Sequence, residues 1–401
     1  MTDVFCAERI GVAKLTKMAF DGVDLRPLWH ELMAKATDDA KGAGIGMDLS
    51  VIAQLLGDQP TGLAIQKEVL ATQRLFRIPC VAPRLRILAL AAEMDIGGNT
   101  PIEFLLEGSD VELATLYVVP GLDWQVPEHD VAIVVAPDDP RTQTTLDEIE
   151  RHIANWPCKI LNPPMRIRQQ DRDRLCSLLR SIPGLDIPMT VRISRADLEG
   201  LNEAEAFRLL EDGGFPLIVR PVCSHAGRGL ALLVAPSGIG AYLAARPESE
   251  FFISRFVDYA SPDGLFRKYR LVCVDGRPYA CHMAISDQWK IWYLNADMAL
   301  SPFKRAEEAH FMATFDDGFG ARHARALSEM IRRVGLDYFT VDCAETKTGE
   351  LLVFEADNTA IVHNMDPARP FPYKAPQMHK VFDAFAAMLY KRAGNPRACA
   401  A

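Results

Sequence analysis

Hydrophobic and polar positions follow two different periods along this chain, and the change of period divides it into regions. In the first 80 residues apolar positions recur every three or four residues, which predicts amphipathic helices. These helices are expected over Leu25–Lys35, Leu49–Leu56 and Thr61–Phe76, with Gly42–Gly46 as a glycine-rich break. No motif here points to a chemistry, so a cap, a dimerisation element and a partner-docking domain all stay open.

From about residue 84, short apolar runs alternate with helical patterns, which predicts a parallel sheet of the βαβ type. Strands are expected at Leu85–Ala91, Leu113–Val119, Val131–Val135 and Lys159–Leu161, and a helix at Thr144–Asn155. The turn Gly97-Gly98 after the first strand is either structural or a binding turn that offers backbone N–H groups to an anion. It is not G-x-G-x-x-G, so the sequence gives little support for dinucleotide binding.

Arginines crowd the segment that closes this region, at Arg166, Arg168, Arg172, Arg174 and Arg180. The pattern is typical of a solvated helix face. The alternative is that one or two of these arginines lean over a functional site.

A second alternation of strands and loops carries most of the basic residues that could bind phosphate. Phe215–Pro221 reads as a strand that ends near Arg220, and the glycine-containing loop Cys223–Leu230 follows it. Glycines allow a backbone to approach a ligand closely, so the loop could cover phosphates, although Gly-Arg-Gly turns are common in hairpins. Phe251–Val257 is the next predicted strand, and it ends at a plausible linker.

A predicted hairpin follows, with Asp275-Gly276 as its turn. Its first strand, Arg267–Val274, places Lys268 and Arg270 on one face because residues two apart on a strand point the same way. Its second strand, Tyr279–Ile285, brings His282 opposite that basic end.

Three acids on two further strands are the most informative feature of the chain. Asp342 ends the apolar run that begins at Tyr338, and Glu355 and Asp357 follow the run Leu351–Phe354 after a Thr-Lys-Thr-Gly-Glu turn. Glu355 and Asp357 should share one face, and a hairpin would fold Asp342 towards them. Converging carboxylates are usually neutralised by hard divalent cations. The alternative is a surface hairpin with solvated acids.

Composition narrows the partners of the chain. Its 401 residues allow two or three domains, and a formal net charge of −9 argues against nucleic acid or an anionic membrane as the main partner. The nine cysteines are scattered without a Cys-x-x-Cys pair, which is typical of reduced cytosolic thiols. With neither a signal-peptide pattern nor a membrane-length apolar run, the expectation is a soluble cytoplasmic protein.

The order of these parts resembles the ATP-grasp superfamily, in particular the carboxylate–amine ligase branch of the RimK and glutathione-synthetase kind. The resemblance covers about 85–395. It implies an α/β and α+β ATP-grasp fold with a preceding βαβ domain. The expected divisions are a helical region 1–80, a pre-ATP-grasp domain 81–195 and an ATP-grasp domain 196–395. The lobes of the last would be about 196–257 and 258–395. A homodimer is also implied.

The resemblance assigns roles by position. It implies phosphate contacts from Arg220 and from the loop Gly227, Arg228 and Gly229, and adenine recognition by the hinge Arg255, Phe256 and Val257. It implies catalytic roles for Arg270, Lys268 and Asn295, with Asn295 in a strand that returns towards the substrate. It also implies metal ligation by Asp342, Glu355 and Asp357.

Two positions depart from the family pattern. Arg220 replaces a lysine, which keeps the charge but presents a planar fork. Asp357 replaces an asparagine, which adds negative charge at the metals. His225 and His282 match no fixed family position and suit packing better than catalysis. For His363, a place in the lining of the substrate pocket and a purely structural role are equally open.

The implied activity is an ATP-dependent ligase that joins a carboxylate to an amine through an acyl phosphate and releases ADP and phosphate. The implied cofactors are ATP and two Mg²⁺ ions, with Mn²⁺ as a substitute, and the implied substrates are small molecules or peptides. Two alternatives stay open: a small-molecule kinase on the same fold, and a non-catalytic nucleotide-binding or partner-docking protein.

Overall fold

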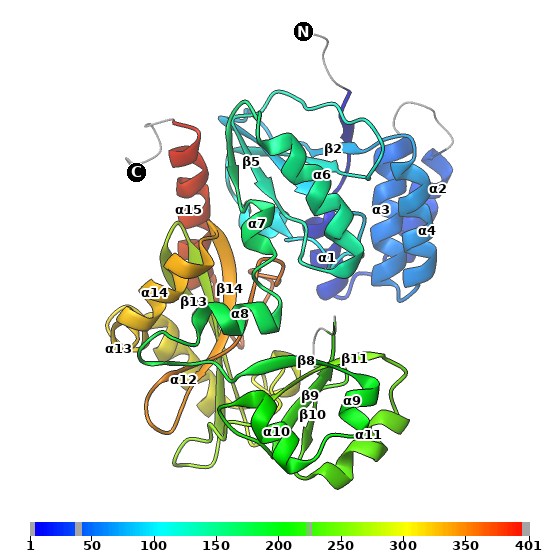
Figure 1. Ribbon diagram of the computed structural model, residues 1–401. Helices are drawn as coiled ribbons and strands as arrows, with labels where there is room; N and C mark the ends of the chain where they lie inside the picture. Colours follow the sequence, from blue (N-terminus) through cyan, green and yellow to red (C-terminus); the bar gives the residue numbers. More distant parts are fainter. Residues whose placement is uncertain (1–4, 37–41, 223, 225–226, 395–401) are drawn as a thin grey trace.

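The computed structural model describes residues 5–36, 42–222, 224 and 227–394, and these form three β-sheets with helices packed around them (Figure 1). One sheet is largely parallel and the other two are largely antiparallel, which confirms the mixed α/β and α+β fold class. None of the helices within the described residues is long and apolar enough to cross a membrane.

The N-terminal sheet contains six strands in the order β1-β2-β4-β3-β5-β6. They are β1 (Ala7–Glu8), β2 (Leu75–Ile78), β3 (Leu85–Ala91), β4 (Val111–Tyr117), β5 (Val131–Val134) and β6 (Lys159–Leu161). β3 pairs in parallel with β4 and β5, and β5 with β6, so the predicted parallel pattern is confirmed. The helices of this part are α1 (Val12–Phe20), α2 (Arg26–Lys35), α3 (Gly42–Leu55), α4 (Gln59–Leu70), α5 (Ile102–Leu105), η1 (Pro140–Thr142) and α6 (Gln143–Ile153).

The predicted glycine-rich break at Gly42–Gly46 is wrong, because these residues lie inside α3. A side-chain carbon added at Gly44 would lie 1.9 Å from the carbonyl oxygen of Glu8, and one at Gly46 would lie 2.5 Å from Val69. Glycine is needed here so that β1 and α4 can approach the helix closely, and not because the chain turns.

The predicted helix Thr61–Phe76 is too long at its C-terminal end. α4 ends at Leu70, and Leu75–Ile78 instead forms β2, which pairs with β1 and β4. The first 80 residues are therefore mainly helical but also contribute two strands to the α/β sheet. The division of the chain near residues 80 and 195 stays a proposal.

A second sheet of four strands forms the lower lobe in Figure 1. Its order is β10-β9-β11-β8, with all pairs antiparallel. Its elements are β8 (Thr190–Ser194), α9 (Arg195–Glu199), α10 (Glu203–Leu210), β9 (Leu217–Pro221), β10 (Ala231–Leu233), η2 (Pro236–Gly238), α11 (Ile239–Ala244) and β11 (Glu250–Arg255).

The third sheet contains five strands in the order β13-β12-β14-β15-β7. Its strands are β7 (Leu185–Asp186), β12 (Phe266–Val274), β13 (Arg277–Ser286), β14 (Tyr338–Glu345) and β15 (Leu351–Asp357). The helices of this part are α7 (Pro164–Ile167), α8 (Arg172–Leu179), η3 (Tyr293–Asn295), α12 (Pro302–Ala313), α13 (Phe319–Arg322), α14 (Ala324–Val334) and α15 (Lys374–Arg392). The predicted hairpin turn is confirmed: Asp275 and Gly276 both have positive φ, as this tight turn requires.

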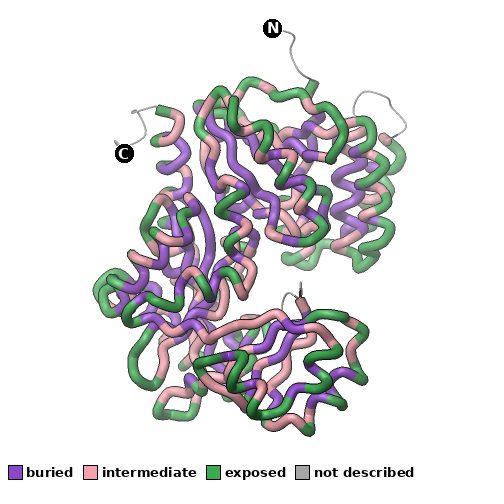
Figure 2. Tube along the Cα trace, viewed as in Figure 1, coloured by how far each residue is buried: buried purple, intermediate pink, exposed green. Residues whose placement is uncertain are grey.

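Two separate hydrophobic cores hold these sheets (Figure 2). The N-terminal sheet and the five-stranded sheet share one large core, which includes Ile87, Val131, Val341 and Phe385. The four-stranded sheet has its own core, which includes Val219 and Phe251. The four-stranded lobe is therefore packed as a unit of its own against a larger body.

Candidate functional site

A cavity of about 1110 Å³ is lined by residues from the four-stranded and five-stranded sheets, from the segments that follow β3 and β5, and from the N-terminal helices. Its walls carry more basic than acidic side chains. The basic ones are Arg141, Arg172, Arg220, Arg228, Arg255, Lys268, Arg270, Lys290 and Lys374, and the acidic ones are Asp95, Asp139, Asp342, Glu355, Asp357 and Asp366. The chain is acidic as a whole, so this local excess of cations marks a place suited to an anion.

Asp342 is held by two basic residues of β12. Arg270 lies opposite Asp342 in the β12–β14 pairing and donates to both of its carboxylate oxygens, at 2.7 and 3.0 Å. The Lys268 ammonium lies 2.6 Å from the same carboxylate. Asp342 is only 2% exposed, and burial alone would raise its pKa. The two cations outweigh that effect and hold the pKa of Asp342 well below its usual range.

Glu355 lies directly opposite Asp342, because the β14–β15 register shifts by one residue between Asp342 and Cys343. Its counter-ion is Arg172 of α8, which donates to the Glu355 carboxylate and, at 3.0 Å, to the carbonyl oxygen of Phe354. Burial raises the pKa of Glu355, but Arg172 and the other nearby cations outweigh burial and lower it overall. Each of these two acids is thus neutralised by basic side chains.

Asp357 follows two residues later on β15 and lines the same cavity. One of its carboxylate oxygens accepts hydrogen bonds from the backbone N–H and the hydroxyl of Thr359, at 2.6 and 2.7 Å. Within the described part of the chain, no group of three His, Cys, Asp or Glu side chains is arranged to hold a metal ion. Metal ligation by Asp342, Glu355 and Asp357 therefore stays a proposal.

Arg220 is a buried cation that forms no ion pair with any described residue. It is 9% exposed and lines the cavity, and its guanidinium donates to the hydroxyl of Ser224, at 3.1 Å, and to the Ser224 carbonyl oxygen. Burial, assisted by the nearby positive charge of Arg172, lowers the pKa of Arg220 to about 9. A buried charge without a counter-ion is costly, and an anion in the cavity would relieve that cost.

The predicted phosphate-covering loop is only partly visible. Cys223, His225 and Ala226 lie outside the described residues, and nothing is concluded about His225. Gly227, Arg228 and Leu230 line the cavity, whereas Gly229 packs against Pro221, where an added side-chain carbon would lie 2.6 Å away. Gly227 and Gly229 both have positive φ, which is the conformation that favours glycine. Arg228 is exposed at the cavity wall.

The predicted hinge lines an apolar part of the cavity. Arg255, Phe256 and Val257 all line it, but the Arg255 side chain is engaged in ion pairs with Asp186 and Asp212, at 2.6 and 3.0 Å. The strand ends at Arg255, so Phe256 and Val257 form the linker after β11.

Aromatic side chains complete this apolar part. The ring of Phe256 packs edge-on against Trp289, with centroids 5.6 Å apart, and the Tyr259 hydroxyl donates to the Trp289 carbonyl oxygen. Val257 and Phe354 pack against Tyr259. A flat apolar ligand group would fit such a surface.

Asn295 was expected in a strand that returns to the substrate, and that expectation is wrong. It lies in the 3₁₀ turn η3, and its side-chain oxygen accepts from the backbone N–H of Trp292, at 2.9 Å. Asn295 still lines the cavity. The Asn295 side chain therefore stabilises the turn η3 through its contact with Trp292.

Two histidines lie on the cavity wall. His282 faces Arg270 across the β12–β13 pairing, and burial and the nearby cations lower its pKa well below the usual value. His363 follows β15, and burial lowers its pKa as well. Both rings are therefore neutral at neutral pH.

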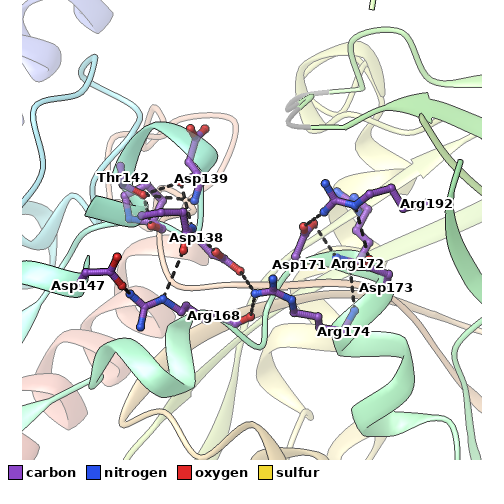
Figure 3. A network of polar contacts seen from close by, with 12 residues as sticks. Asp138, Asp139, Thr142, Asp147, Arg168, Asp171, Arg172, Asp173, Arg174 and Arg192 are labelled. Atoms are coloured by element: carbon purple, nitrogen blue, oxygen red, sulfur yellow. Dashed lines mark hydrogen bonds and ion pairs between the residues drawn. The ribbon is translucent and has the colours of Figure 1, made fainter. Parts of the chain in front are cut away.

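Arg172 was not singled out from the arginine-rich segment, although the sequence allowed one or two arginines there to reach a site. Figure 3 shows the neighbourhood that fixes its position: Asp171 and Asp173 flank it and meet Arg192 of β8. Arg168 and Arg174 belong instead to contacts with Asp147 and Asp138 on the other side. Only the fold distinguishes Arg172 from its neighbours.

A buried polar cluster around Lys374 also escaped prediction. Glu308 of α12, which is 0% exposed, accepts from the hydroxyls of Tyr293 and Tyr373, at 3.0 and 2.5 Å. Lys374, the first residue of α15, donates to Asp366 at 3.2 Å and lies 3.5 Å from Glu308. No sequence motif marks these residues, because they come together only through the packing of α12 against α15.

The N-terminal helices supply part of the cavity wall. Phe20 at the end of α1 and Gln59 at the start of α4 both line it. The Gln59 amide donates to Asp95 at 2.8 Å, beside the Gly97-Gly98 turn, which also lines the cavity. These helices thus contribute to the site itself.

Searches of the sequence against protein-family models and against curated proteins return no match. Among solved structures, the chain is similar to a RimK domain ATP-grasp protein from Sphaerobacter thermophilus DSM 20745, with 18% sequence identity, a TM-score of 0.44 and coverage of 76% of this chain and 99% of that chain. It is also similar to VanG D-Ala:D-Ser ligase from Enterococcus faecalis, with 12% identity, a TM-score of 0.44 and coverage of 76% and 100%. We base the function on the geometry of the site.

Proposed function

We propose that this protein is an ATP-dependent ligase of the ATP-grasp type, which joins a carboxylate to an amine through an acyl phosphate and releases ADP and phosphate. The observation that carries the proposal is the buried guanidinium of Arg220 in the cavity wall, which donates to Ser224 but forms no ion pair with a described residue, next to the paired acids of β14 and β15. A phosphate chain would supply the anion that Arg220 lacks.

The nucleotide would lie between the apolar linker and this cation. Phe256, Val257 and Trp289 offer a surface for the adenine ring, and the exposed Arg228 could add a second cation to the phosphates from the loop side. The similar arrangement of parts in the RimK-like family supports this orientation.

Asp342, Glu355 and Asp357 offer only carboxylate oxygens, which fits a hard cation such as Mg²⁺ or Mn²⁺. We propose that Asp342, Glu355 and Asp357 would hold two Mg²⁺ ions, and bound Mg²⁺ would supply positive charge that offsets the charge of the phosphates. The present partners of the acids, Lys268 and Arg172, would then be available to the substrate or the phosphates.

The reaction needs positioning and charge neutralisation more than proton transfer by side chains. The substrate carboxylate would attack the γ-phosphorus as ADP leaves, and the amine would then displace phosphate from the acyl carbon and lose a proton. Arg220 and Arg270 would offset the charge that moves on to the leaving groups. The acyl phosphate hydrolyses readily, so the cavity must exclude water while it exists.

The test is a product analysis with purified protein, ATP, Mg²⁺ and pools of carboxylates and amines. We expect ADP, phosphate and a new amide. AMP with pyrophosphate would contradict the mechanism, and a stable phosphorylated product without an amide would identify a kinase instead. Binding of ATP without turnover in any pool would favour a non-catalytic nucleotide-binding protein.

A pair of variants on one hairpin locates the site. Glu355→Ala removes a proposed metal ligand and should abolish turnover. Glu350→Ala removes an exposed acid from the turn of the same hairpin and should leave turnover unchanged. Activity of Glu355→Ala within a few-fold of the wild type would mean that the metal site is elsewhere.

A further inference from the structure

Four exposed apolar side chains, which we call the apolar end of the cavity, come from segments other than those that carry Arg220 and Phe256. Phe20, Trp292, Leu294 and Ile361 all line the cavity, yet they are 46%, 51%, 69% and 43% exposed. They come from α1, from the turn η3 and its start, and from the segment after β15. Single exposed apolar residues are ordinary, but several that converge on one cavity from separate segments mark a surface that a ligand covers.

Contacts between neighbouring residues indicate that these apolar side chains surround one polar centre. Tyr293, which lies between Trp292 and Leu294 in the chain, packs against His282 with ring centroids 4.6 Å apart. Phe20 lies near His363, with centroids 6.4 Å apart. The two histidines are linked through Lys374, whose ammonium lies 4.0 Å from the centre of the Tyr293 ring and affects the pKa of both.

The polar centre offers hydrogen-bond donors. The Nδ1 atom of His363 accepts from the backbone N–H of Met365 at 3.1 Å, so the neutral ring carries its proton on Nε2 and can donate it. The Lys374 ammonium, which pairs with Asp366 and Glu308, adds a cation. Arg270, which pairs with Asp342, lies opposite His282 on the neighbouring strand and adds a second cation. Donors and cations of this kind match a carboxylate.

We propose that this end of the cavity binds a carboxylate substrate that carries a bulky apolar side chain. Its carboxylate would lie towards Arg270 and His282, and its apolar part would lie against Phe20, Trp292, Leu294 and Ile361. The proposal rests on the proposed ligase function and names the class of its carboxylate substrate.

The size of the cavity supports two ligands. Sites for a single drug-sized ligand hold roughly 300–1,000 Å³, and this cavity holds about 1110 Å³. A nucleotide along the Phe256 and Arg220 side would therefore leave room for a substrate of substantial size at the other end.

Binding of simple probes tests the proposal without any need for turnover. We would titrate the protein calorimetrically with phenylbutyrate, butyrate and phenylbutylamine, each with and without Mg²⁺ and a non-hydrolysable ATP analogue. Phenylbutyrate should bind at least about tenfold more tightly than butyrate, because burying an apolar group of this size is worth more than the free-energy equivalent of a factor of ten. It should also bind more tightly than phenylbutylamine, which lacks the negative charge.

Matched variants assign the binding to this end of the cavity. Leu294→Ser combined with Ile361→Ser should weaken phenylbutyrate binding about tenfold. Leu300→Ser is the control, because Leu300 is 80% exposed and does not line the cavity. Unfolding temperatures of the variants would verify that all of them fold.

The outcomes separate this proposal from the proposed function. The apolar subsite would be overturned, even if the protein makes an amide, by any of three results. Phenylbutyrate and butyrate could bind equally, neither could bind, or the cavity variants and Leu300→Ser could have equal effects. Equal or tighter binding of phenylbutylamine would overturn the carboxylate assignment. Selective binding of phenylbutyrate would support the subsite even if the product analysis revealed a kinase.

Discussion

Arg172 donates to the carboxylate of Glu355 and to the carbonyl oxygen that precedes it, although the two residues lie far apart in the sequence. The contact joins the start of α8 to the end of β15 across the cavity wall. It means that the charge of Glu355 is already balanced by this chain's own side chain. A ligand that binds there must either contact Arg172 or displace it from Glu355.

Arg172→Ala should lower ATP-dependent turnover by at least about tenfold, because removal of a preorganised donor from a phosphoryl-transfer site typically costs that much or more. Steady-state kinetics at saturating and limiting ATP would measure the loss. Arg174→Ala is the matched control, since Arg174 is half-exposed and contacts Arg168 and Asp138 instead. Similar activities of the two variants would exclude Arg172 from the site.

Arg220→Met should weaken nucleotide binding without lowering the stability of the ligand-free protein. Removing a buried charge without a counter-ion should leave the unfolding temperature of the ligand-free protein unchanged or raise it. The stabilisation by ATP and Mg²⁺ should be largely lost, because the phosphates lose their buried cation. Thermal unfolding with and without nucleotide measures both effects.

Arg208→Met provides the comparison for that experiment, because Arg208 is an exposed residue of α10 in the same lobe and does not line the cavity. It should change neither the unfolding temperature nor the nucleotide shift. A large drop in the stability of ligand-free Arg220→Met, together with an intact nucleotide shift, would show that Arg220 is structural.

The Asp342 carboxylate should make stability depend on pH in a defined window. Its pKa in the folded protein lies below the value of about 3.9 expected in the unfolded chain. The stabilisation is therefore present above about pH 4 and is lost as the pH falls towards the folded pKa.

Asp342→Asn should accordingly be less stable than the wild type by an amount that is constant near neutral pH and shrinks below about pH 4. Chemical unfolding of both proteins over this pH range would measure the difference. A difference that grew as the pH fell would contradict the ion pairs with Lys268 and Arg270.

The buried cluster at Lys374 should be important for folding. Glu308→Ala would leave Lys374 with Asp366 as its remaining acid and remove the acceptor of two tyrosine hydroxyls. Loss of one partner of a buried ion pair typically costs about 3–5 kcal/mol in free energy of unfolding. Glu308→Gln keeps an acceptor oxygen and should cost less, and urea unfolding of both variants would compare them.

The acid hairpin was predictable because strand geometry is local. Residues two apart share a face, and the short turn after Glu345 pairs the two apolar runs, so the sequence predicts that Asp342 comes near Glu355. Their direct opposition was not predictable, because it depends on a register shift of one residue between Asp342 and Cys343. The Asp275-Gly276 turn also follows from the sequence, whereas a similar shift between Arg270 and Leu271 sets Arg270 opposite His282.

Other features depend on tertiary contacts that local patterns do not contain. From the sequence, Gly44 is interpreted as a helix breaker, and only the close approach of Glu8 explains why glycine is needed there. Arg172 cannot be distinguished from the other arginines of its segment before the packing of α8 against β15 is known. The family resemblance implies a strand at Asn295, whereas its side chain closes a turn.

The contribution of α1 and α4 to the cavity has a consequence for how selectivity could diverge. The acids and cations that would handle phosphate all lie beyond residue 160, whereas Phe20 and Gln59 come from the first 60 residues. Exchange of this leading segment between related chains could redirect substrate choice while the phosphate-handling machinery stayed intact. The segment would then act as an exchangeable selectivity module.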